Sequence, residues 1–128
     1  MKKIIVGIVI GGISIFFLFF MATCFLIGRD VRKKCGEAKK QYTGNCVEAL
    51  TSLLNDENQS FRARNSAIWT LGQLGNSYAL PVLEKYYTGN IPPRESLDKM
   101  ISQYELKKAI KLASGGLNIT AFFWRSEL

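Results

Sequence analysis

Carboxylates are the side chains of this chain that could perform acid–base chemistry, because its 128 residues include no histidine. Nucleophile pairs that need histidine and histidine-containing zinc sites are therefore excluded. Two carboxylates could still act as general acid and base. The candidates are Glu48, Asp56, Glu57, Glu84, Glu95, Asp98 and Glu105. Each falls where a solvated helix face, a loop or a helix cap would place it, so we expect no catalytic residue and a protein that is not an enzyme.

Motifs for cofactors and metals do not occur either. The cysteines lack CxxC spacing, and Gly72-Gln73-Leu74-Gly75 is typical of a helix end rather than of a phosphate-binding loop. We therefore expect no cofactor and no metal site.

Two cysteines, Cys35 and Cys46, could pair, since Cys24 lies in an apolar run. If a helix ends near Tyr42 and the chain turns back over residues 43–45, Cys35 lies about 9 Å from the level of Cys46 at ~1.5 Å per residue. A disulfide needs Cα atoms within about 7 Å, so it would require the helix to end earlier. We favour two half-buried thiols, and the cysteines leave the compartment open.

Residues Ile4 to Ile27 carry no charge. As a helix they would reach about 36 Å, enough to cross a bilayer core of ~30 Å. A cleaved signal peptide is the alternative, but its apolar region normally spans about 7 to 15 residues. We therefore predict a transmembrane anchor over residues 1–28. Gly7 and Gly11 form a GxxxG pair, through which a homodimer could assemble.

Positive charge follows the apolar run at once. The chain carries +7 overall, and residues 29–44 form a basic juxtamembrane helix and turn. The candidate lipid contacts are Arg29, Arg32, Lys33 and Lys34. Six basic residues on this side against Lys2 and Lys3 on the other favour a cytoplasmic domain over an exported one.

The segment from Phe61 to Leu83 organises the rest of the chain. Ala67, Ile68, Leu71 and Leu74 recur at helical spacing, and Gly75 ends the helix before a second apolar run. A helix pair of this kind must stack on similar neighbours to bury its apolar face. Its motif residues are Arg64, Ala67, Leu71, Gly72, Leu74, Gly75, Ala79, Leu80, Pro81 and Leu83.

This spacing resembles a HEAT-like repeat of the short prokaryotic type, also found in phycobilisome lyases. The resemblance covers about residues 46–113 and implies a short α-solenoid. With the transmembrane helix predicted from the uncharged run in front of it, the expected fold class is all-α. In such repeats the arginine at the position of Arg64 commonly braces neighbouring helix ends. Phycobilisome lyase activity is not carried over, because those enzymes are longer arrays.

Four parts follow along the chain: the anchor (1–28), the juxtamembrane segment (29–44), a HEAT-like helical domain (45–116) and an aromatic tail (117–128). Within the domain we expect a short helical turn near Leu97, then a helix from about Gln103 to Ala113 that opens with a capping box between Ser102 and Glu105. The tail, with Phe122, Phe123 and Trp124 in a row, would cover the open end of the repeats or enter the membrane interface.

These features predict a membrane-anchored protein that binds another protein, as an adaptor, scaffold or assembly factor. The candidate partner contacts are Trp69, Arg62, Asn90, Ile91 and Arg94. The alternative is binding of anionic lipid or nucleic acid through residues 29–40 and 107–111. Nucleic acid is the less favoured ligand, because the basic residues are not interleaved with aromatic ones.

Overall fold

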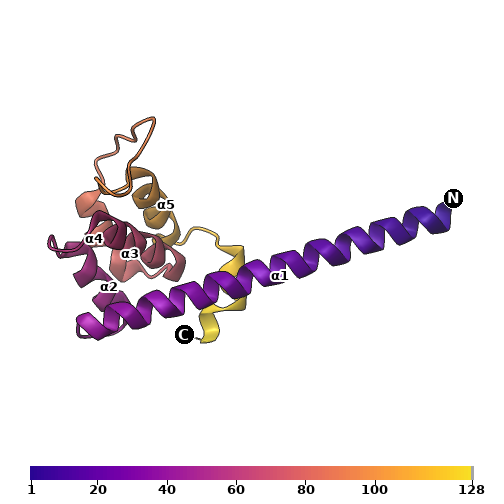
Figure 1. The fold of residues 1–128 in the computed structure, drawn as a ribbon, viewed down its shortest axis with the longest axis horizontal. Coiled ribbons are helices and arrows are strands. Elements are labelled where there is room, and N and C mark those ends of the chain that lie inside the picture. The colour runs from indigo at the N-terminus through magenta and orange to yellow at the C-terminus, as the bar shows by residue number, and fades with distance from the viewer. Residues whose placement is uncertain (128) are drawn as a thin grey trace.

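The protein is a long N-terminal helix with a small helical domain packed on its C-terminal part (Figure 1). The computed structural model describes residues 1–127, and within that range every regular element is helical. The expected fold class is confirmed: an all-α domain behind one long apolar helix. The helices are α1 (Lys2–Gln41), α2 (Cys46–Asn55), α3 (Phe61–Leu74), α4 (Leu80–Tyr86) and α5 (Gln103–Ala113), with short 3-10 turns η1 (Ser77–Ala79), η2 (Ile119–Phe123) and η3 (Arg125–Glu127).

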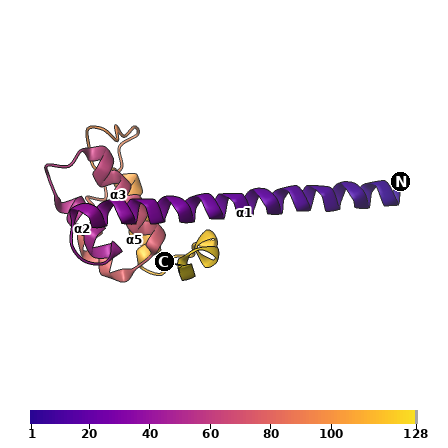
Figure 2. The ribbon, with the colours of Figure 1, turned by 60° about the horizontal axis from the view of Figure 1, so that its bottom comes forward.

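Helix α1 has two different halves. Its N-terminal half projects away from the domain with its side chains exposed, as Figure 2 shows. Its C-terminal half buries Val31, Cys35 and Ala38, which recur every three to four residues on the face toward α2 and α3. One continuous helix therefore passes from an uncovered apolar segment into the core of the domain.

Helix α3 lies at the centre of the domain and packs against α1, α2 and α5. Its buried residues include Ala67, Ile68 and Leu71, from the stripe that the sequence predicts. The predicted N-caps of α2 and α3 are confirmed. The Asn45 side chain accepts a hydrogen bond from Glu48 N, and Ser60 Oγ accepts one from Ala63 N.

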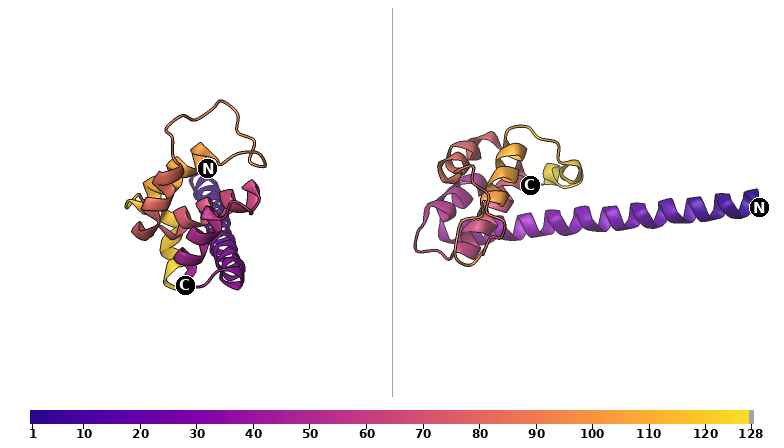
Figure 3. Two further views of the ribbon diagram at one scale, coloured as in Figure 1. Left: turned by 90° about the vertical axis from the view of Figure 1, so that its left-hand side faces the viewer. Right: turned by 90° about the horizontal axis from the view of Figure 1, so that it is seen from above.

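The helix after Gly75 differs from the expected second member of a pair. The chain forms η1 first, and α4 then has only seven residues and packs mainly on α5 and to a lesser extent on α2. A helix of two turns cannot extend along the 14 residues of α3, so α3 packs on α1, α2 and α5 instead. Figure 3, seen along α1 and from above, shows this arrangement.

The start of α5 also differs from the prediction. Residues 97–99 form a turn and no helix. Ser102 Oγ accepts a hydrogen bond from Glu105 N, as a capping box requires. The reciprocal bond is absent, however, because Ser102 N donates to Asn65 Oδ1. Glu95 caps the helix instead, and its Oε1 accepts hydrogen bonds from Gln103 N and Tyr104 N.

The tail folds back along α1, beside the point where the domain begins (Figure 1). Trp124 is buried against Gly28, and Arg125 donates two hydrogen bonds to the carbonyl of Gln73 at the end of α3. The tail thus joins the end of α3 to the middle of α1. Its last residue, 128, lies outside the described residues.

Candidate functional site

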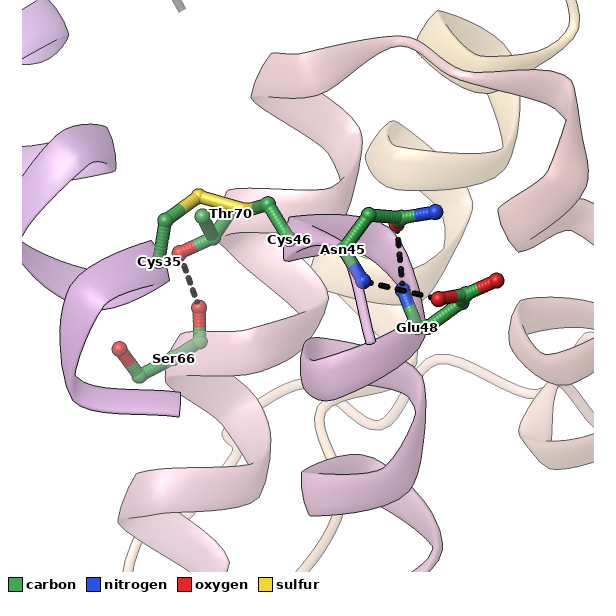
Figure 4. Close-up of a disulfide and its surroundings, with 6 residues drawn as sticks. All are labelled: Cys35, Asn45, Cys46, Glu48, Ser66 and Thr70. Carbon is green, nitrogen blue, oxygen red and sulfur yellow. Dashed lines mark hydrogen bonds between the residues drawn. A yellow bond between two sulfur atoms is a disulfide. The ribbon is translucent and has the colours of Figure 1, made fainter. Parts of the chain in front are cut away.

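A disulfide joins α2 to α1, which is one of the helices that line the candidate site. Cys35 of α1 and Cys46 at the start of α2 are joined, with their Cα atoms 5.1 Å apart (Figure 4). The preferred prediction of two thiols is therefore wrong. Tyr42 and Asn45 have extended backbones, so the connection reaches back along α1 and places Cys46 beside Cys35 rather than beside Gln41.

Polar and aromatic side chains line a groove between α1, α3 and α5, with a volume of about 390 Å³. We call it the α1–α3–α5 groove. It is lined by Asp30 and Lys34 of α1, by Arg62, Asn65, Ser66 and Trp69 of α3, by Leu97 of the loop before α5, and by Glu105 of α5. The four residues of α3 recur at helical spacing, so they occupy one face of that helix.

The groove's cations have partners within the chain. Lys34 Nζ donates to Ser66 Oγ over 2.6 Å, and Arg62 makes two hydrogen bonds to Asp98, at 2.8 and 3.2 Å. These bonds and the opposite charge hold the pKa of Asp98 below its usual value and raise that of Arg62. The ion pair also ties the loop before α5 to the start of α3.

The groove's carboxylates differ from each other. Glu105 is half-buried and pairs with Lys108 at 3.3 Å. Asp30 is exposed, and its side chain makes no hydrogen bond or ion pair with the described residues. Trp69 is half-buried and packs against the core. Among the described residues, the groove therefore combines a partly exposed indole with a carboxylate that has no partner, which suits a ligand with an apolar group next to a cation.

The arginine of the central motif does not line the groove and is buried elsewhere on α3. Arg64 Nε donates to the carbonyl of Leu54 at the end of α2, over 2.9 Å, and its guanidinium lies over the rings of Phe61 and Tyr86. Ala67, Leu71, Gly72, Ala79 and Leu83 are buried, Leu74, Gly75 and Leu80 are half-buried, and Pro81 is exposed.

The five candidate partner contacts lie in two places. Arg62 and Trp69 line the groove, whereas Asn90, Ile91 and Arg94 lie on the loop between α4 and α5, whose tip projects away from the helices (Figure 1). Sequence reasoning missed Asp30, Asn65, Ser66, Leu97 and Glu105 as lining residues. The spacing of residues 62, 65, 66 and 69 could have revealed the face of α3, but not the helices opposite it.

The basic segments proposed for lipid or nucleic acid lie on separate helices, α1 and α5. Arg29 and Lys33 are exposed, and Lys33 pairs with Glu37 at 4.0 Å. Arg32 is half-buried, and Lys34 points into the groove. Lys108 contacts the ring of Tyr104. Several of these basic residues thus contact other side chains of the protein, besides contributing positive charge to its surface.

A family match locates the repeat. The HEAT-like repeat family matches residues 21–74. This range runs from the middle of α1 to the end of α3, so it begins earlier and ends earlier than the predicted 46–113. The difference has a structural reason, since the C-terminal half of α1 packs on α2 and α3 as a helix of the repeat. The match supports a HEAT-repeat protein and does not single out the phycobilisome lyase type.

A similarity to an enzyme corrects the functional prediction. Over 87 residues, 66% of this chain, the sequence is 32% identical to deoxyhypusine hydroxylase of Schizosaccharomyces pombe. The aligned part is 26% of that protein, so the chain spans about a quarter of its relative's length. The expectation that the chain is not an enzyme is contradicted by this similarity. No solved structure gives a significant match.

Proposed function

We propose that this protein is a membrane-anchored HEAT-like module that binds a segment of another protein in the α1–α3–α5 groove. The observation that carries the proposal is Trp69, which lines a groove together with Asp30, whose carboxylate makes no hydrogen bond or ion pair with the described residues. Tryptophan is among the residues that dominate binding energy at protein interfaces. HEAT-like repeats are typical interaction modules, because stacked helices present an extended surface.

The anchor is supported by the exposure of α1. Its most apolar window of 18 residues has a mean hydropathy of 2.8, and none of that window is buried by the rest of the protein. A core helix of a soluble domain would be covered, whereas most isoleucines and phenylalanines of this segment expose more than half of their surface. A signal sequence near the N-terminus can meet the same criteria of length and composition. The continuity of α1 into the core of the domain favours a retained segment.

We propose that the domain lies on the oxidising side of the membrane, because a disulfide such as Cys35–Cys46 persists in oxidising compartments. The basic residues after the apolar run favour the opposite side, but that rule is a statistical bias. Lys34 also has a separate role, since it bonds to Ser66 within the domain. A membrane-impermeant maleimide added to intact cells should label Cys35 and Cys46 only after reduction. Free thiols that react only after the cells are permeabilised would overturn this orientation.

The groove is tested by a photo-crosslinking amino acid at Leu97, which is 47% exposed at its rim. In membranes we expect an adduct with one protein, and we expect Trp69→Ala or Asp30→Lys to remove it. The matched control places the crosslinker at Tyr78, which is 86% exposed and outside the groove. An equal pattern from both positions would refute the groove as the binding site. Binding that disappears steeply with salt would favour the alternative of an anionic ligand.

A second candidate function is catalytic, and the similarity to deoxyhypusine hydroxylase favours it. In this view the groove holds the side chain of a substrate protein. The test co-expresses the chain with a protein that carries deoxyhypusine and follows the mass of that protein. The gain of one oxygen atom with the native chain, but not with Trp69→Ala, would support an enzyme. An unchanged mass with both chains would argue against hydroxylation of this substrate.

A further inference from the structure

We infer that the tail segment 117–126 is a second membrane contact, whose exposed apolar side chains enter the lipid beside α1. The inference rests on the proposed anchoring of α1 and adds a surface that the anchor alone does not require. Figures 1 and 3 show the tail crossing α1 on the side of the domain that faces the projecting half of the helix.

The depth of the tail follows from a ring contact. Phe123 packs edge-on against Phe20, with ring centroids 5.7 Å apart. The uncharged run Ile4–Ile27 has its centre between Ile15 and Phe16, so Phe20 lies about 7 Å from that centre at ~1.5 Å per residue. A hydrocarbon core of ~30 Å extends about 15 Å to each side of its centre. With the run centred in the bilayer, Phe20 and the ring against it lie below the hydrocarbon surface.

The surface of the tail suits that depth. The exposed fractions of Leu117, Ile119, Phe122 and Phe123 lie between 49% and 75%. A tail that only covers the end of the repeats would turn such side chains inward, because apolar surface in water is unfavourable. Trp124 turns inward, against Gly28 at the end of the uncharged run, and the small side chain of Ala121 is buried as well. Tryptophan and phenylalanine are favoured at the boundary between lipid and water.

Polar bonds hold the tail in this place from the side of the domain. Arg125 Nη2 donates to Gln73 O over 2.6 Å, and Asn118 Nδ2 donates to Gln73 Oε1 over 2.9 Å. The end of α3 is thereby linked to the segment that would enter the lipid. Lipid is the occupant that the structure favours, because the exposed apolar side chains continue the uncovered apolar surface of α1.

The test uses tryptophan fluorescence in nanodiscs with brominated phosphatidylcholine, whose bromines quench nearby indoles. The reporter Phe122→Trp is made in the background Trp69→Phe and Trp124→Phe, and the matched control is Tyr78→Trp in the same background. A third reporter, Phe16→Trp, monitors the anchor. We expect brominated lipid to lower the emission of the Phe122 and Phe16 reporters at least twofold and to leave the Tyr78 reporter unchanged.

The outcomes separate the two proposals. Quenching at position 16 without quenching at position 122 would overturn the lipid contact of the tail and leave the anchor intact. Absence of quenching at both positions would overturn the anchor, and the tail contact with it. If the background disturbs the tail, Phe122→Trp is made in the single variant Trp69→Phe instead, which keeps Trp124 in its buried place. Brominated lipid should then remove a larger share of the emission from this chain than from Trp69→Phe alone, and equal losses from the two chains would overturn the inference.

Discussion

Trp124 covers Gly28 so closely that a Cβ atom at residue 28 would lie 2.6 Å from the Cβ of Trp124. This contact joins the tail to α1 at the place where the uncharged run ends. Glycine at this position is therefore needed for the close approach of the tail and not for the backbone of the helix. The contact connects the packing of the domain to the position of the tail near the membrane.

Gly28→Ala should loosen the tail and lower the free energy of unfolding by about 1–3 kcal/mol, because the added methyl group forces Trp124 to move. The matched control is Gly36→Ala on the same helix, where an added Cβ meets nothing within 4 Å. That change should be neutral or stabilising by up to about 1 kcal/mol. Denaturant unfolding in detergent measures both, and equal stabilities would contradict the packing role of Gly28.

Gly72→Ala should separate α3 from α5, because a Cβ at residue 72 would lie 2.8 Å from the Cα of Ala109. We expect a loss of about 1–3 kcal/mol in the free energy of unfolding. Adding Ala109→Gly should restore only part of this loss, since the Cα of residue 109 remains in place. Full restoration in thermal unfolding would show that the methyl group of Ala109, and not the backbone of α5, limits the approach.

Loss of the disulfide should destabilise the domain. Cys35 and Cys46 are 11 residues apart, and closing a loop of this length in the unfolded chain corresponds to about 3 kcal/mol in the chain-entropy account. The double variant Cys35→Ser and Cys46→Ser should therefore unfold at a lower temperature than the oxidised protein. A reducing agent should lower the melting temperature of the native chain but leave that of the double variant unchanged. Insensitivity of the native chain would contradict the cross-link.

Glu95→Gln should destabilise α5 more than Glu105→Gln does. The carboxylate of Glu95 accepts hydrogen bonds from Gln103 N, Tyr104 N and Ser102 Oγ at the positive end of the helix. We expect a loss of about 1–2 kcal/mol, comparable to the loss of a strong N-cap. Glu105→Gln removes only the pairing with Lys108. Thermal unfolding compares the melting temperatures of the two variants. A lower melting temperature for Glu105→Gln than for Glu95→Gln would contradict the capping role of Glu95.

The ion pair at the groove makes a prediction about pH. The pKa of Asp98 is lowered in the folded protein by its hydrogen bonds and charge contact with Arg62. The pair therefore contributes stability above the unfolded pKa of about 3.9, and this contribution is lost as the pH falls through the lower, folded pKa. In a carboxyl NMR titration, Arg62→Gln should raise the pKa of Asp98 toward its ordinary value.

The internal control is Asp56. A hydrogen bond from Tyr42 Oη lowers its pKa, and this pair lies apart from Arg62. Its titration should not change with Arg62→Gln. A change of equal size at both carboxylates would indicate a general change in the fold rather than the loss of one ion pair.

Several features could be predicted from the sequence because they depend on local chemistry. Helical spacing gave the buried stripe of α3, and Asn45 and Ser60 marked the N-caps of α2 and α3 through side chains that accept bonds from nearby backbone N–H groups. The uncharged run predicted a helix long enough to span a bilayer. Each of these properties is fixed by residues within one or two helical turns of each other.

Tertiary packing decided the rest. The extended backbone of Tyr42 and Asn45 determines where Cys46 meets Cys35, and Asn65 takes the backbone N–H that the predicted capping box assigned to Glu105. The groove, likewise, needs α1 and α5 on either side of Trp69. These contacts join residues more than ten positions apart, so no periodicity along the chain encodes them, and they form only when the helices pack together.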